Sequence, residues 1–183
     1  MRFEMMYLIL AGIILGSLII GENGANETTA ETLTTSQLGL NAVAIANSFI
    51  ERATSTTLAF DEYTIGNPVR PNQSDSTGGL DKLSTPGRDA GEMSQALYDD
   101  VDDFNGMDTM ITVSSIGNFH VHTSVTYYDP AAGSPTLTKT WFKQFVVSVA
   151  DTVPGSTTHN FQFNGQQARI QKNVILSYYK FLQ

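Results

Sequence analysis

The sequence predicts an α+β fold in which a long N-terminal helix packs on an antiparallel β-sheet. The first observation behind this prediction is an apolar run from Met5 to Ile20. The second is a set of apolar residues at helical spacing between Leu38 and Ala53, and the third is a series of segments after residue 108 that are rich in Val, Thr and aromatic residues. Because the helical and extended segments occupy separate parts of the chain, we expect the helix to cover one face of the sheet.

Length and composition limit the classes of protein to which this chain can belong. The chain has 183 residues, no cysteine and a formal net charge of −8. This length accommodates one domain of ordinary size together with an anchor. The lack of cysteine excludes disulfides and cysteine-based metal sites. The negative charge repels phosphate backbones, so we expect no nucleic-acid partner.

The apolar run divides the chain into three parts. We expect a hydrophobic helix over residues 1–20, a polar connector over residues 21–37 and a head over residues 38–183. As a helix, the run spans about 24 Å, which is shorter than the ~30 Å hydrocarbon core of a bilayer. Arg2 is the only basic residue before Arg52, so the N-terminus should face the cytoplasm and the head should be exported. The alternative is a cleaved secretory signal peptide.

Three residues of the hydrophobic helix are candidates for an assembly role. Gly12 and Gly16 form a small-xxx-small pair, which allows two helices to approach closely. Glu4 lies at the edge of the apolar run, where a carboxylate needs hydration or a cationic partner. In a helix bundle it could pair with the N-terminal amine of a neighbour, and in a bilayer it could lie among the headgroups.

The polar connector is a weak helix former. Gly21 and Gly24, together with several threonines, lower its helical propensity. A continuous long helix and a helix broken near residues 21–35 therefore remain alternatives. From Leu38 the apolar spacing returns and predicts a helix up to Ala53.

The remainder of the chain predicts a loop followed by strands. Turn signals fill residues 61–96, and residues 93–98 could form one helical turn or more. The residue pattern then predicts strands over residues 109–115, 118–128, 138–151 and 173–181, and a short strand or a loop over residues 159–163.

Three segments give the chain a resemblance to type IV pilins and pseudopilins, and more narrowly to minor pilins of the mannose-sensitive haemagglutinin type. Residues 40–51 resemble the second half of the family's helix, where an Ala-rich run leads to an acidic residue. Residues 98–106, Tyr-Asp-Asp-Val-Asp-Asp-Phe-Asn-Gly, resemble an acidic segment between helix and sheet. Residues 141–151 followed by 174–179 resemble the family's last two strands. One departure is that the family's Phe-Thr-Leu-Ile-Glu start is not matched, and the acidic residue is Glu4.

The resemblance implies a structural subunit of an extracellular filament, of the type IV pilus or type II secretion pseudopilus kind. Such a subunit is anchored in the inner membrane before assembly and is then moved into a helical filament at the cell surface. Its partners would be copies of itself, the membrane and the assembly machinery. The alternative is a membrane-tethered or secreted β-rich surface domain that binds an envelope partner or ligand without polymerising. No nucleophile or triad spacing favours an enzyme.

The acidic segment is a candidate calcium site. Its oxygen-bearing residues are Asp99, Asp100, Asp102, Asp103 and Asn105, with Asp108 close behind them. Calcium takes six to eight oxygen ligands, and some pseudopilins bind it in this region. The pattern does not match an EF-hand, because Val101 occupies the first ligand position. The alternative, which the sequence favours, is that these side chains cap turns and remain solvated.

His120 and His122 lie two residues apart on a predicted strand and therefore point to one face. Two imidazoles can bind zinc only with further ligands, and the sequence indicates none. We therefore expect two surface histidines, no metal centre there and no resident cofactor.

Overall fold

The computed structural model describes residue 33 and residues 36–55, 57–65, 79–114, 116–151, 161–163 and 166–179. The hydrophobic helix, with Glu4, Gly12 and Gly16, lies outside these residues, as does nearly all of the polar connector. No helix in the described part of the chain has the length and apolar character needed to cross a bilayer.

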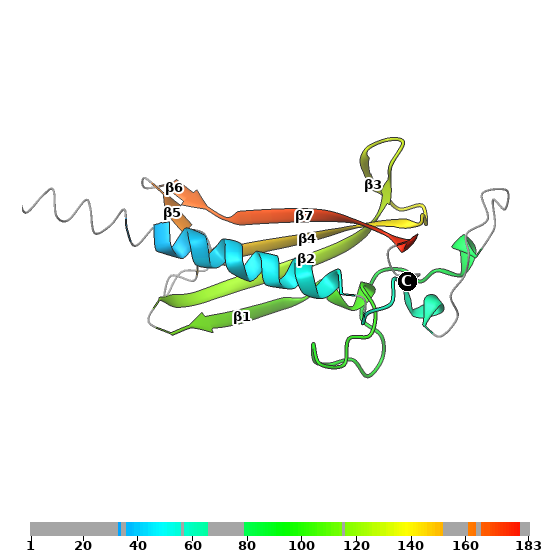
Figure 1. Ribbon diagram of the computed structural model, residues 1–183, viewed down its shortest axis with the longest axis horizontal. Coiled ribbons are helices and arrows are strands. Elements are labelled where there is room, and N and C mark those ends of the chain that lie inside the picture. Colours follow the sequence, from blue (N-terminus) through cyan, green and yellow to red (C-terminus); the bar gives the residue numbers. More distant parts are fainter. Residues whose placement is uncertain are drawn as a thin grey trace, which may run out of the picture.

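The one long described helix covers residues 36–53 and lies lengthwise over one face of the sheet (Figure 1). Its buried face consists of small and large apolar side chains at three- and four-residue spacing. These residues are Ala42, Ile45, Ala46, Phe49 and Ala53. Alanine at three of these positions allows the helix to approach the strands closely, while Phe49 fills the space beside them.

The main sheet is antiparallel and has the strand order β1-β2-β4-β7, with the short β3 pairing on β2. Its strands are β1 (Asp108–Val113), β2 (Gly117–Asp129), β3 (Ser134–Thr136), β4 (Phe142–Asp151) and β7 (Ile170–Ser177). A separate hairpin joins β5 (Phe161–Phe163) to β6 (Gln166–Ala168). The long strands β2 and β4 pair over nine residues, from Phe119 opposite Asp151 to Tyr127 opposite Lys143.

Alternation along the central strands sets the position of the core. Alternate residues of β2 and β4 are buried towards the helix, and the residues between them are only partly buried. The buried set includes Phe119, Val121, Val125, Phe145, Val147 and Val149. Together with the apolar face of the helix, these side chains form one continuous hydrophobic cluster.

Beyond the helix the chain enters a region held by turns. Three short 3₁₀ helices, η1 (Glu62–Thr64), η2 (Leu80–Lys82) and η3 (Asp102–Phe104), lie here. A parallel bridge joins Ala59 to Asp100, which brings the segment after the helix against the acidic segment. Both segments thereby reach the same end of the sheet.

The predicted α+β class with an antiparallel sheet is confirmed, and so is the helix near residues 38–53. Several finer predictions need correction. Residues 93–98 form a single turn, closed by a hydrogen bond from Leu97 N to the carbonyl of Ser94, and no regular helix. Strand β4 begins at Phe142 rather than at residue 138, because the Thr140 hydroxyl bonds to the backbone of Tyr128 and Phe142 and ends the ladder. Strands β3 and β6 were not predicted from the sequence.

Phe104 offers a test of the core. It is fully buried and packs edge-on against Tyr98 at 5.1 Å and Phe145 at 5.7 Å between ring centroids. We expect Phe104→Ala to lower the free energy of unfolding by about 3–5 kcal/mol, because the cavity cannot fully collapse. Denaturant unfolding followed by the fluorescence of the single tryptophan, Trp141, measures this. The control Leu137→Ala, at a fully exposed position, should change stability by less than about 0.5 kcal/mol.

Candidate functional site

A buried lysine lies at the centre of the candidate site. Lys143 is the second residue of β4 and has the same inward orientation as Phe145 and Val147. Its side chain is completely shielded from solvent. A buried ammonium group is costly unless it is paired and hydrogen-bonded, so the fold must bring acceptors to it.

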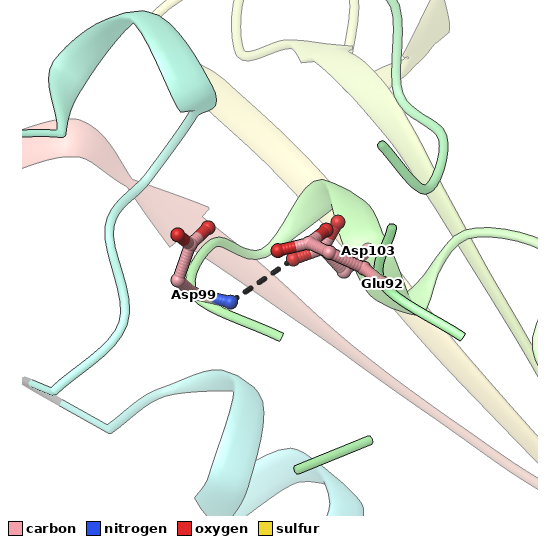
Figure 2. Close-up of side chains that lie close together, drawn as sticks. All are labelled: Glu92, Asp99 and Asp103. Carbon is pink, nitrogen blue, oxygen red and sulfur yellow. Dashed lines mark hydrogen bonds between the residues drawn. The ribbon is translucent and has the colours of Figure 1, made fainter. Parts of the chain in front are cut away.

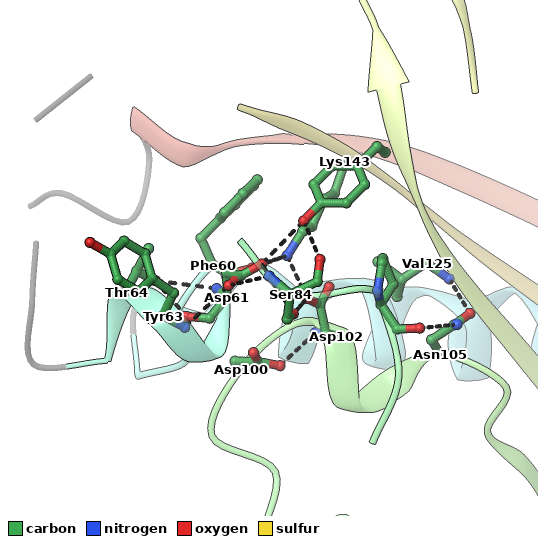
Figure 3. Close-up of polar contacts among 12 residues, drawn as sticks. Phe60, Asp61, Tyr63, Thr64, Ser84, Asp100, Asp102, Asn105, Val125 and Lys143 are labelled. Atoms are coloured by element: carbon green, nitrogen blue, oxygen red, sulfur yellow. Dashed lines mark hydrogen bonds and ion pairs between the residues drawn. The ribbon is translucent and has the colours of Figure 1, made fainter. Parts of the chain in front are cut away.

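Three oxygen atoms from two segments surround the ammonium group (Figure 3). Lys143 Nζ lies 2.9 Å from Asp61 Oδ2 and 2.7 Å from Asp102 Oδ2, and it donates a further 2.7 Å hydrogen bond to the carbonyl of Phe60. Both carboxylates are at least 98% buried. The ring of Phe60 lies 4.4 Å from Nζ and adds a cation–π contact.

Asp61 is held by donors from several elements. It caps η1 by accepting a hydrogen bond from Tyr63 N, and both of its oxygens accept from Ser84 N. The hydroxyl of Tyr127 also donates to it. Burial raises the pKa of Asp61, but the charge and hydrogen bond of Lys143 and the backbone donors outweigh burial and hold that pKa below its usual value. Asp61 is therefore an ionised partner.

Asp102 has fewer donors. Its Oδ2 accepts from Ser84 Oγ at 2.8 Å as well as from Lys143, while its Oδ1 is buried and has no hydrogen-bond partner among the described residues. Burial raises the pKa of Asp102 to about 6, although Lys143 and Ser84 act in the opposite direction. Asp61 and Asp102 thus share one cation but differ in how firmly each is held as an anion.

Asp100 lies next to this group and serves the backbone. Its Oδ1 accepts hydrogen bonds from the N–H groups of Asp102 at 2.6 Å and Asp103 at 3.2 Å, which closes the first turn of η3. Burial, followed by repulsion from Asp102, raises the pKa of Asp100 to about 8. At neutral pH this side chain is therefore largely uncharged.

A second cluster contains the carboxylates of Glu92, Asp99 and Asp103 (Figure 2). One oxygen of each lies within 4.8 Å of the others. Asp103 is buried and accepts from the N–H groups of Asp99 and Asp100, whereas Asp99 is exposed. A side-chain hydrogen bond to Asp103 and burial raise the pKa of Glu92 to about 7. These three groups can hold a shared proton or a cation.

The structure therefore places the five residues suggested as calcium ligands in different surroundings. Only Asp99 and Asp103 lie together, and Glu92, which the sequence analysis did not include, joins them. Asp102 bonds to Lys143, and Asp100 caps η3. Asn105 donates to the carbonyl of Pro86 and accepts from Val125 N. The expectation of turn-capping is correct for Asp100, but its side chain is buried and not solvated.

The two histidines of β2 lie beside an aspartate of β1. His120 Nε2 is 2.5 Å from Asp108 Oδ1, and His122 Nδ1 is 3.9 Å from Asp108 Oδ2. His122 and Asp108 are more than half exposed. Both imidazoles thus lie beside one carboxylate across the antiparallel register of β1 and β2.

Sequence reasoning missed the residues that complete the buried site: Lys143, Asp61 and Ser84. A signal for Lys143 was present, because it alternates with Phe145 and Val147 on the buried face of a predicted strand. Asp61 and Ser84 lie in the loop-rich region, where no periodicity predicts which polar residues become buried.

Comparisons with known proteins identify no relative of this chain. No family model matches it, and neither does any curated protein or solved structure.

Asp100 makes the stability of the head depend on pH. Between about pH 4 and pH 8 the unfolded carboxyl is ionised while the folded one retains its proton, so the free energy of unfolding should fall as pH rises. Asp100→Asn keeps an acceptor for the two N–H groups and removes the charge. We expect this variant to gain about 1 kcal/mol or more relative to the parent at about pH 8 compared with pH 4.5. Denaturant unfolding at both pH values measures the difference.

The exposed Asp81→Asn on η2 is the matched control for this series and should follow the parent profile. A parent and an Asp100→Asn variant with parallel pH profiles would contradict the role given to Asp100.

The calcium hypothesis now makes a sharper prediction for Glu92, Asp99 and Asp103. Adding Ca²⁺ should release or absorb heat in calorimetry and should raise the Tm, and a chelator should reverse the rise. The effect should weaken below about pH 7, because a proton on Glu92 competes with the cation. Glu92→Gln should reduce binding, while the exposed Glu51→Gln should not. Without heat and without a Tm shift in the parent, the calcium hypothesis is wrong.

Proposed function

We propose that the chain is a structural subunit of an extracellular filament, of the type IV pilus or type II secretion pseudopilus kind, and that it carries out no catalysis. In this proposal the hydrophobic helix over residues 1–20 anchors the subunit in the inner membrane and later packs with copies of itself in the filament core. The head then lies on the filament surface. The assembly machinery of such filaments would move it from one environment to the other.

The single observation that carries this proposal is the packing of the helix over residues 36–53 on the sheet. Its inner face is buried against the sheet (Figure 1). In the sequence, the helix follows the connector and the apolar run. Its outer face leaves Leu40 71% exposed. A helix that is fixed to a rigid head on one side, and preceded by an apolar segment, is suited to joining that head to a bundle of helices.

The energetics of the apolar run are compatible with both environments. Lipid tails and neighbouring apolar helices offer similar apolar contact, so moving the run between them costs little. Gly12 and Gly16 would allow close approach between helices in the filament, and Glu4 would pair with an N-terminal amine. These residues are the assembly determinants of the proposal.

Polar contacts add to the apolar packing between the helix and the rest of the head. Arg52 donates to the side chain and the carbonyl of Gln95 and lies 5.8 Å from the ring centroid of Phe104. Lys172 of β7 donates a 2.7 Å hydrogen bond to Asn47 in the helix. These hydrogen bonds, from Arg52 to Gln95 and from Lys172 to Asn47, supplement the apolar contact between the helix and the sheet.

Electron microscopy of sheared cell-surface material tests the proposal. We expect filaments that contain this chain, and we expect the double variant Gly12→Leu, Gly16→Leu to insert in membranes but to assemble poorly, because bulky side chains separate the helices. Gly87→Leu is the control, since a Cβ at Gly87 meets only an ordinary contact 3.9 Å away. Recovery of the parent chain solely as a monomer from detergent-extracted membranes would favour a membrane-tethered binding domain instead.

A further inference from the structure

The buried ion pair at Lys143 has an unusual composition. One ammonium group lies between two carboxylates that are both almost fully shielded from water, and one of these carboxylates has an oxygen, Asp102 Oδ1, without a hydrogen-bond partner in the described structure. A buried unpaired carboxylate oxygen costs free energy, and native structures rarely keep one without a reason. The ammonium nitrogen lies 2.7 Å from the other oxygen of the same carboxylate.

We propose that Lys143 and Asp102 form an intramolecular amide bond, with Asp61 as the group that transfers protons. The bond would join Nζ of β4 to Cγ of η3 inside the hydrophobic interior (Figure 3). The proposal is independent of the filament function, because it concerns only side chains within the head.

The chemistry balances without any external reagent. Asp61 Oδ2 takes one proton from Lys143 Nζ, which frees the nitrogen lone pair, and Nζ then bonds to Cγ of Asp102. The bond from Cγ to Oδ1 breaks, and this oxygen leaves as water with two of the three ammonium protons, one of them returned by Asp61. The third proton remains on the amide nitrogen. An ammonium and a carboxylate thus become an amide and one water, with no change in oxidation state.

Geometry assigns the reaction to Asp102 rather than to Asp61. The leaving oxygen of Asp102 is the one that has no hydrogen bond to lose, while Oδ2 keeps its bond from Ser84 Oγ as the amide oxygen. Both oxygens of Asp61, in contrast, accept from Ser84 N, and Oδ1 also accepts from Tyr63 N. These donors stabilise Asp61 as a carboxylate, which makes its carbon the poorer electrophile, while its Oδ2 lies 2.9 Å from Nζ, within reach of a proton.

The surroundings favour the amide over the ion pair. The backbone fixes nitrogen and carboxyl group against each other, and such alignment replaces a bimolecular encounter by a unimolecular one. The rings of Phe60 and Tyr127 lie 4.4 Å and 5.3 Å from Nζ and limit access of water to the product. Forming the amide also removes two buried charges, whose desolvation is expensive, and the Asp61 carboxylate that loses its cation keeps the hydrogen bonds from Tyr63 N and Ser84 N.

Intact mass spectrometry of the denatured full-length chain tests the proposal. We expect a mass lower by one water than the sequence requires. Trypsin cleaves after Lys and Arg but not after an acylated lysine, so the digest should contain residues 89–139 joined to residues 140–169. A parent with the full mass and free cleavage after Lys143 overturns the proposal. A bond mapped to the peptide that begins at Ala53 and contains Asp61 overturns the assignment to Asp102.

Variants distinguish formation of this amide from other reactions that lower the mass by one water. Lys143→Arg keeps a cation but cannot form this amide, so it should show the full mass. Lys172→Arg, on the neighbouring strand β7, should retain the loss of one water and is the matched control. Asp61→Asn should leave the full mass in most molecules, although both bonding partners are present. If Lys143→Arg fails to fold, the mass and peptide map of the parent decide alone.

Discussion

The burial of the Lys143 ammonium group is the constraint on which one end of this fold depends. An alkyl chain on the inner face of β4 carries the charge into an apolar interior, and no water reaches it. Segments far apart in the sequence must therefore supply acceptors, and they do so through Phe60, Asp61 and Asp102. Removing Lys143 would leave two buried carboxylates without their shared cation, so the loops around the site are fixed by electrostatics as much as by apolar contact.

Side-chain acceptors replace regular structure in this region. Asp61, Asp100 and Asn105 each bond to backbone N–H groups that no helix or strand satisfies. Because buried backbone groups must be paired, such acceptors allow a loop-rich segment to pack against the sheet. The chain has no cysteine to hold these loops by disulfides. Asp61 and Asp100 therefore act as hydrogen-bond acceptors for backbone N–H groups, whatever charge each carries.

The sequence predicted the elements whose pattern extends over many residues. The helix over residues 36–53 and the strands β2 and β4 were predictable because their periodicity is repeated several times. Strand β3 has three residues and β6 has three, too few for a period to be recognised. The sequence indicated the acidic segment as a candidate site. It did not indicate that Asp102 pairs with Lys143 while Asp99 and Asp103 lie beside Glu92, because tertiary packing sets these contacts.

The two proposals meet in the path by which force would travel through a filament subunit. In a filament of the proposed kind, a pull on the helix over residues 36–53 would reach the segment that follows it, which the Ala59–Asp100 bridge joins to the segment of η3. The contact between Asp102 and Lys143 on β4 is one of the connections from η3 to the central strands, beside the hydrogen bond from the Thr123 hydroxyl of β2 to the carbonyl of Phe104. An ion pair at this point resists load only while water is excluded, whereas an amide bond resists it covalently. A subunit that works under tension would therefore gain from a cross-link at this contact, which joins a short 3₁₀ helix to a central strand.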